Sequence, residues 1–295
     1  MWIWLVLLYG ILKGCREICK KKALLTSSPI EVLLIYSFIS FLLVAADFKN
    51  ALGMEPRFYF YIAIKSFVIF LAWIMSFTAI RKLPLSMYGV LDLSRVLFST
   101  LLGIIVLGEK MTPVHIFGLC LVCAGLLMLK LRIKKPETAE NERVLPEKLQ
   151  TVQKKYSIGI IVIALISCLL NSISGLMDKL LTKHINSSQL QFWYMFFLCL
   201  FYIIYALVLK EKVSVKRAVK NKWIWILAIM FVIADRALFI ANADPASEVT
   251  VMTLIKQAGA VVTILAGKFI FKEKNVGHKL ICAAIIIVGI MLGVM

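Results

Sequence analysis

Few of the groups that enzymes use for catalysis occur in this sequence. Only 17% of its 295 residues are charged, and three are histidine. It has no Walker-type phosphate loop, no dinucleotide fingerprint and no nucleophile elbow. The seven cysteines lie in apolar segments, which favours small buried side chains over metal or redox chemistry. We therefore predict neither an enzyme nor an ATP-driven pump, and we predict no catalytic residue, metal ligand or cofactor.

Apolar residues, by contrast, make up 61% of the chain. The cores of a soluble protein of this size cannot cover so much apolar surface, so lipid must solvate much of it. The net charge of +18 could suggest nucleic acid, but Lys and Arg flank the apolar runs instead of gathering on one polar domain. We predict a membrane protein that contacts lipids and does not bind nucleic acid.

The apolar residues form runs long enough to cross a bilayer, whose core of about 30 Å needs about 20 helical residues. Ten such runs cover residues 2–20, 30–46, 58–80, 84–107, 112–131, 157–180, 188–209, 222–243, 246–270 and 276–294. The predicted fold class is all-α integral membrane, with ten transmembrane helices.

The second half of the chain repeats the first at nearly constant offsets. Gly103, Glu109, Lys110 and Gly125 precede Gly267, Glu273, Lys274 and Gly289 by 164 residues, and Gly14, Glu17 and Pro84 precede Gly175, Asp178 and Pro245 by 161. We expect two inverted five-helix repeats, residues 1–131 and 157–295, joined by a polar linker over 132–156. Duplicated membrane units commonly build an alternating-access pathway.

Lys and Arg concentrate in the connections that follow the odd-numbered runs, such as residues 20–22 and the linker. Cytoplasmic loops carry the excess of Lys and Arg in membrane proteins. We therefore predict a multi-pass protein of the cell (plasma) membrane with both termini outside.

Charged residues occur within the runs, and such residues are costly in a bilayer unless they face a cavity or a partner. In the run that begins at Pro84, Tyr88, Asp92, Arg95 and Ser99 share one helical face. We interpret this face as lining a substrate cavity. The simpler alternative is that Asp92 and Arg95 only neutralise each other.

The ninth run carries Lys256 close to Thr253 and Gln257, in the position that corresponds to Asp92 of the first half. We predict that all three contact substrate; in the alternative, Lys256 reaches the membrane surface or pairs with an acid.

The eighth run carries Asp235 and Arg236. Neighbouring residues point about 100° apart on a helix, so only one of the two can face a narrow cavity directly. We predict that both belong to the site and favour Arg236 as the contact to a substrate anion.

The first run carries Lys13, Arg16, Glu17 and Lys20 on one stripe, and its counterpart in the second half carries Asp178. We consider Glu17 and Asp178 for ion coupling, since a carboxyl in a low dielectric exchanges protons more readily near neutral pH. The competing interpretation is that both form ion pairs at the membrane interface. Lys65 of the third run could reach the membrane surface.

Each half ends in an apolar helix, a Glu-Lys hinge and a final helix that contains glycine. The hinges are residues 103–110 (GIIVLGEK), before Gly118 and Gly125, and 267–274 (GKFIFKEK), before Gly277 and Gly289. This pattern, which covers nearly the whole chain, resembles the EamA family of the drug/metabolite transporter superfamily. The resemblance implies a ten-helix carrier of a metabolite such as an amino acid, a nucleotide sugar or a sugar phosphate.

The resemblance also implies roles for single residues. In the nucleotide-sugar and sugar-phosphate branches, a lysine in the ninth helix contacts the substrate anion, and that role maps to Lys256. The Gly-Ala-Leu-Asn motif that precedes it there is replaced here by residues 252–255 (MTLI), which argues against a nucleotide sugar. Glu17 and Asp178 are similar in position to the proton-coupling glutamate of small multidrug exporters. Typical family members have cytoplasmic termini, opposite to the Lys and Arg distribution here.

We therefore predict a secondary transporter, an exporter or exchanger, that moves a small polar, anionic or zwitterionic metabolite by alternating access. The alternative is a non-transporting membrane protein that handles lipid head groups or assists a membrane complex. The sequence leaves open the substrate, the coupling ion and whether the protein forms a homodimer.

Overall fold

The structure is a computed structural model. It describes residues 2–107, 113–114, 116–118, 120–121, 124–125, 128, 158–210, 213–247, 252, 255–256, 258–273 and 276–292. Over these residues the chain is all-helical and contains no strand, as predicted. The predicted linker over 132–156, together with Glu109, Lys110 and Lys274, lies outside the described residues.

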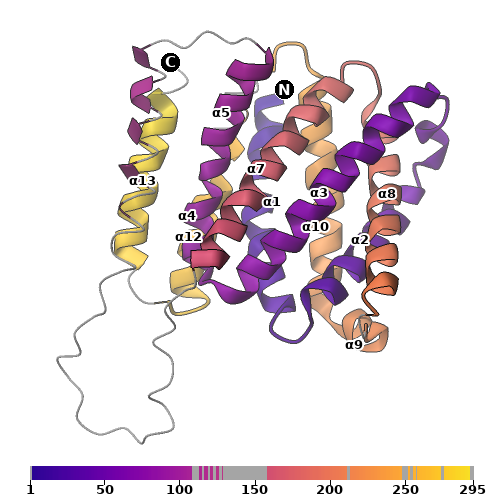
Figure 1. The fold of residues 1–295 in the computed structure, drawn as a ribbon, viewed down its shortest axis with the longest axis horizontal. Helices are drawn as coiled ribbons and strands as arrows, with labels where there is room; N and C mark the ends of the chain where they lie inside the picture. Colours follow the sequence, from indigo (N-terminus) through magenta and orange to yellow (C-terminus); the bar gives the residue numbers. More distant parts are fainter. Residues whose placement is uncertain are drawn as a thin grey trace, which may run out of the picture.

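The described helices match eight of the predicted runs closely, whereas most of the run over 112–131 and the first part of that over 246–270 lie outside the described residues. The helices are α1 (Trp2–Ala23), α2 (Pro29–Ala45), η1 (Phe48–Ala51), α3 (Pro56–Lys82), α4 (Leu85–Asp92), α5 (Ser94–Leu107), α7 (Ile158–Leu181), α8 (Ser187–Val208), α9 (Val215–Lys220), α10 (Lys222–Ala243), α12 (Ala258–Phe269) and α13 (Val276–Leu292). Helix α1 begins and α13 ends at the same end of the bundle, near the N and C marks in Figure 1.

Five of the described helical segments are long and apolar enough to cross a membrane. They are Pro56–Lys82, Leu85–Val106, Ile158–Leu181, Ser187–Val208 and Lys222–Ala243. Large apolar side chains point outward; Trp4, Ile105 and Leu207 are each more than 70% exposed. Such a surface suits lipid, because water would disfavour it.

The second helix of each half begins with the same local signal. Ser28 and Glu31 form a capping box at the start of α2, and Asn186 and Gln189 form one at the start of α8. Each box supplies partners for backbone N–H groups that the first helical turn leaves free.

The run predicted as one helix over 84–107 is divided at Leu93 into α4 and α5. Side chains of α7 contact backbone carbonyls on both sides of this division. The Cys168 thiol lies 3.7 Å from the Leu91 carbonyl oxygen, and the Ser172 hydroxyl donates to the Arg95 carbonyl over 3.0 Å. These contacts give membrane-embedded backbone groups partners at an irregularity.

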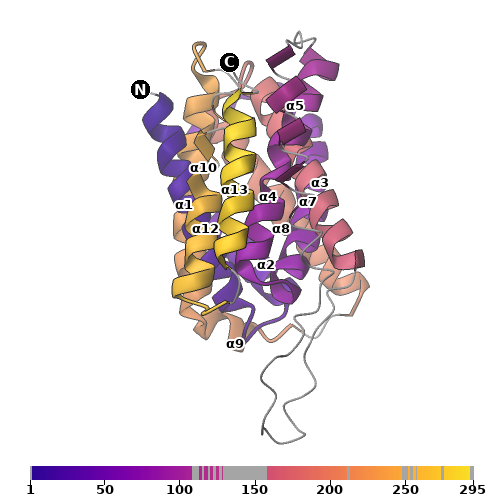
Figure 2. The same ribbon diagram turned by 90° about the vertical axis from the view of Figure 1, so that its left-hand side faces the viewer.

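The helices of the two halves interleave. Helix α1 packs against α10 and α12, while α7 packs against α3 and α5; α2 packs against α8, and α4 against α12. Figure 2 shows α1, α12 and α13 side by side on one face of the molecule. All of these contacts join helices from opposite halves, so the halves do not form separate domains.

Glycines allow α1 and α12 to approach closely. A Cβ atom on Gly14 would lie 2.7 Å from the Gly259 carbonyl oxygen, and one on Gly259 would lie 2.5 Å from the Gly10 carbonyl oxygen. Any larger residue would force these backbones apart, as expected where small residues mediate helix packing in membranes.

Glu273, the acid of the second hinge, joins the end of α12 to the beginning of α4. Its carboxylate accepts hydrogen bonds from the backbone N–H groups of Leu85 (2.5 Å) and Ser86 (3.1 Å), and from the Ser86 hydroxyl. The Lys279 ammonium donates to the same hydroxyl over 2.6 Å. A negative charge at a helix N-terminus is favourable, so this contact fastens α4 to the hinge.

We predict that Glu273→Ala lowers the stability of the protein by about 1–2 kcal/mol, because α4 loses its cap. The midpoint of thermal unfolding in detergent measures the effect. Glu55→Ala is the matched control, since Glu55 precedes α3 without capping it and forms only an exposed ion pair with Arg57. Equal midpoints for the two variants would contradict the capping role.

Candidate functional site

A cavity of about 140 Å³ lies inside the helical bundle, lined by helices of both halves. Its described lining is rich in charge. Seven cationic and three acidic side chains face it, namely Lys13, Arg16, Lys20, Lys65, Arg95, Lys179 and Lys256 with Glu17, Asp178 and Asp235. Ionised groups at this density in a membrane protein mark a hydrated, functional site.

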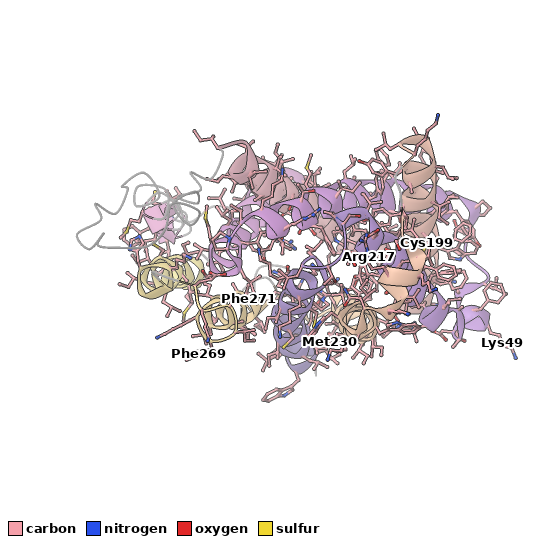
Figure 3. All side chains as sticks on the ribbon, turned by 90° about the horizontal axis from the view of Figure 1, so that it is seen from below. Lys49, Cys199, Arg217, Met230, Phe269 and Phe271 are labelled. Carbon is pink, nitrogen blue, oxygen red and sulfur yellow. The ribbon has the colours of Figure 1, made fainter. Side chains whose placement is uncertain are left out.

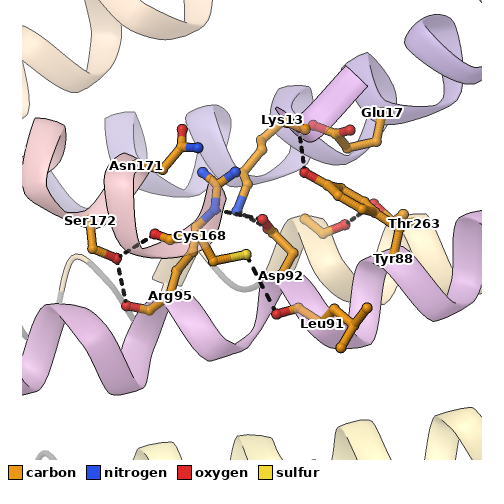
Figure 4. A network of polar contacts seen from close by, with 12 residues as sticks. Lys13, Glu17, Tyr88, Leu91, Asp92, Arg95, Cys168, Asn171, Ser172 and Thr263 are labelled. Atoms are coloured by element: carbon orange, nitrogen blue, oxygen red, sulfur yellow. Dashed lines mark hydrogen bonds and ion pairs between the residues drawn. The ribbon is translucent and has the colours of Figure 1, made fainter. Parts of the chain in front are cut away.

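Asp92 holds two of these cations. The Lys13 ammonium lies 2.5 Å from one carboxylate oxygen, and the Arg95 guanidinium lies 2.6 Å from the other. Figure 4 shows both side chains converging on Asp92, between α1, α4 and α5. The predicted Asp92–Arg95 contact is therefore present, but the pair does not simply neutralise itself, because Lys13 adds a second positive charge.

Arg16 joins the two halves through Asp235. Its guanidinium lies 3.2 Å from the Asp235 carboxylate of α10, and both side chains line the cavity. The guanidinium also lies 5.4 Å from the centre of the Tyr9 ring and 5.0 Å from that of Phe231, distances suited to cation–π contact. The sequence analysis noted Arg16 on the charged stripe of α1 but did not place it with Asp235.

The two acids considered for ion coupling both line the cavity and are buried. Asp178 of α7 pairs with Lys65 of α3 over 2.9 Å, and Glu17 pairs with Lys20 on the same helix over 2.7 Å. Both acids are therefore in ion pairs, as the competing interpretation expects, and these pairs lie in the wall of the cavity. Lys65 does not reach the surface, because it is 1% exposed and its ammonium lies 3.3 Å from the centre of the Tyr194 ring.

Lys256 differs from the other cations of the cavity. No carboxylate among the described residues lies within ion-pair distance of its ammonium, which lies 5.8 Å from the centre of the Tyr9 ring. Its electrostatic neighbours are the acids Asp178 and Asp235 and the cations Lys13 and Lys179. The alternative in which Lys256 pairs with an acid therefore finds no direct partner in the described part of the chain.

Arg236 does not line the described cavity. Its guanidinium donates to Gln191 (2.5 Å) and Ser188 (2.6 Å) of α8 and to Asp47 (2.8 Å) before η1. Asp235 and Arg236 point in different directions, as their adjacency on the helix requires, but Asp235 is the one that faces the cavity. Hydrogen bonds from Ser188 and Asn50, together with Arg236, lower the pKa of the Asp47 carboxyl, which strengthens this pair outside the cavity.

The remaining predicted site residues are not brought to the cavity by the described structure. Tyr88 is 1% exposed, and its hydroxyl lies 2.6 Å from that of Ser76, a residue of the cavity wall. Thr253 and Gln257 lie outside the described residues.

Aromatic residues form a wall of the cavity that the sequence analysis did not identify. The rings of Tyr36, Trp73 and Phe231 contact one another with centres 5.2–5.5 Å apart, and all three line the cavity. Tyr9 had a usable signal, because it lies four residues before Lys13 on the same helical face.

A model of the EamA-like transporter family matches residues 1–131. The match covers less than half of the chain, so the first part of the sequence is similar to this family of the drug/metabolite transporter superfamily. Together with the five described helices that are long and apolar enough to cross a bilayer, this similarity indicates a multi-pass membrane protein. Among 28 similar chains of solved structures, one titled "Crystal structure of protein" has a TM-score of 0.66 at 15% identity, over 98% of this chain and 94% of that one. This likeness establishes the fold alone. No curated protein matches the sequence.

We predict that Lys65→Met destabilises the protein by about 3–5 kcal/mol, since it leaves the Asp178 carboxylate buried without its partner. The double variant Lys65→Met/Asp178→Leu should recover most of that loss, because it removes both charges. Denaturation midpoints of the wild type, both single variants and the double variant measure the coupling. A double variant as unstable as the sum of the two single variants would contradict the pairing.

Proposed function

We propose that this protein is a secondary transporter of a small anionic or zwitterionic metabolite, working by alternating access as an exporter or exchanger in the cell membrane. The observation that carries the proposal is the charged cavity between the two halves of the chain. Substrate enters this cavity from one side of the membrane and leaves on the other. Arg95, Asp235 and Lys256 contact it, Asp92 and Tyr88 position these contacts, and Thr253 and Gln257 belong to the same site.

The ion pairs that cross the cavity support this function. Arg16–Asp235 and Lys65–Asp178 each join a cation of the first half to an acid of the second. Buried ion pairs stabilise a fold weakly compared with apolar side chains of the same size. Groups of this kind are therefore better explained by a polar substrate or by a change of pairing during transport than by stability. Glu17 and Asp178 are the candidates for such a change.

The packing of the helices supports two inverted repeats. When the halves are exchanged, α1 corresponds to α7, α3 to α10, and the α4–α5 pair to α12. The contacts of α1 with α10 and α12 then become those of α7 with α3 and α5, which are also present. Halves that pack in this reciprocal manner can exchange conformations and so open a central site to opposite sides of the membrane.

The corresponding glycines Gly14 and Gly175 differ in how closely other helices approach them. A Cβ on Gly14 would collide with Val262 and Gly259, whereas a Cβ on Gly175 would meet nothing within 4 Å, and Gly175 lines the cavity. We propose that α1 and α12 are closed together in this state while α7 and α5 are apart at Gly175. In the opposite state, α7 and α5 would pack together at Gly175, which has no side chain to keep them apart.

We predict that Lys256→Ala lowers the transport rate at limiting substrate by about tenfold or more, since a charge-assisted contact of about 1.5–3 kcal/mol is lost. Proteoliposomes are offered a defined pool of amino acids, dicarboxylates and phosphate esters, and mass spectrometry identifies the solute that accumulates. Lys49→Ala is the control, because Lys49 is exposed at the edge of the molecule (Figure 3). Wild-type rates for Lys256→Ala would remove this residue from the site.

We predict opposite effects for Gly14→Ala and Gly175→Ala. The first should lower the unfolding midpoint, since α1 and α12 must separate. The second should leave that midpoint unchanged or raise it slightly, through a helix propensity gain of up to about 1 kcal/mol, yet slow transport. Both variants are measured for unfolding in detergent and for transport in proteoliposomes. Transport at the wild-type rate by Gly175→Ala would contradict closure at this glycine.

A further inference from the structure

The charges around the cavity do not balance. With Asp92 included, seven described cations face four carboxylates. Asp92 serves two of the cations, and neither Lys179 nor Lys256 has a carboxylate partner among the described residues. An uncompensated buried charge is costly, so the site favours a ligand that brings negative charge with it.

Two of the cations lie near a single ring that also lines the cavity. Arg16 Cζ lies 5.4 Å and Lys256 Nζ lies 5.8 Å from the centre of the Tyr9 ring. Arg16 gives one nitrogen to Asp235, but its buried Nε has no hydrogen-bond partner among the described residues. Lys256 likewise donates to no described acceptor. Tyr9, Arg16 and Lys256 all line the cavity, so one small ligand bound beside Tyr9 lies near both cations.

The carboxylates of the site are already occupied by cations. Asp92, Asp178 and Asp235 are each in an ion pair of 3.2 Å or less. Glu17 keeps one buried oxygen without a partner, but Lys20 balances its charge. The ammonium group of a zwitterion would therefore have to displace a lysine or an arginine, whereas an added anion meets no such competitor.

We propose that the ligand of this cavity carries at least two negative charges, one held by Lys256 and the other by Arg16, beside Tyr9. The ligand class is a small dicarboxylate or a phosphate monoester dianion. This inference rests on the proposed transport function and narrows its substrate class. Of the three surplus positive charges, a dianion leaves one uncompensated, a monoanion two and a zwitterion all three.

The test compares ligands that differ in charge but little in shape. Dissociation constants are measured by calorimetry on the full-length protein in detergent at pH 8. The carboxylate set is succinate, succinamate and succinamide, which carry two, one and no charges, with 4-aminobutanoate as a zwitterion of similar length. The phosphate set is methyl phosphate, a dianion above its second pKa of about 6, against the monoanion methyl sulfate. The two sets distinguish a dicarboxylate from a phosphate ester.

We expect at least one dianion to bind about tenfold or more tightly than its matched monoanion. Lys256→Gln should reduce that preference about tenfold, and the paired variant Arg16→Gln/Asp235→Asn should do the same without leaving an unpaired carboxylate. Lys49→Gln, exposed and away from the cavity, should keep the wild-type preference.

Equal affinity for a dianion and its monoanion, tighter binding of 4-aminobutanoate, or no binding of any probe at millimolar concentration would overturn the inference. A separate experiment, the transport assay, decides whether the proposed function is correct. Proteoliposomes that accumulate no solute of the pool would contradict transport, while accumulation of zwitterions only would leave transport intact and reject the dianion.

Discussion

Ionised side chains inside a membrane require compensation, and this requirement governs the centre of the molecule. Asp92 binds Lys13 and Arg95, while Asp235 binds Arg16 across the boundary between the halves. These pairs remove part of the desolvation cost but not all of it, because cations outnumber carboxylates in the described lining. A charged cavity that is only partly neutralised contributes little to the stability of the fold, but it is suited to binding a charged substrate.

The rest of the fold positions this cavity. Close contact of α1 with α12 at Gly14 and Gly259 brings the charged face of α1 toward the centre, and Glu273 fastens the start of α4. Aromatic rings, including those of Tyr36 and Trp73, form part of the wall and limit the room around the ion pairs. Apolar side chains on the outside contact lipid, so polarity increases from the surface to the centre, the reverse of a soluble protein.

The sequence predicted the helices well, because apolar runs bounded by Pro, Gly and charge are strong local signals. It also predicted that Arg95, Asp235 and Lys256 share a site, because each is a charge within an apolar run. It could not predict which side chains pair between helices. Arg16 pairs with Asp235, and Lys65 with Asp178, because of helix packing that a single sequence does not reveal. The choice of Arg236 over Asp235 failed for the same reason, since the rotation of α10 depends on its neighbours.

The central claim is that the cavity is reached in turn from the two sides of the membrane. Ser174 of α7 lines it and provides a position for a single cysteine in a variant whose native cysteines are replaced by serine or alanine. Labelling of Ser174→Cys by a membrane-impermeant thiol reagent, applied separately to each side of sealed vesicles, tests the claim most directly. The account predicts labelling from both sides and protection by bound substrate. Labelling from one side only, whatever substrate is present, would contradict it.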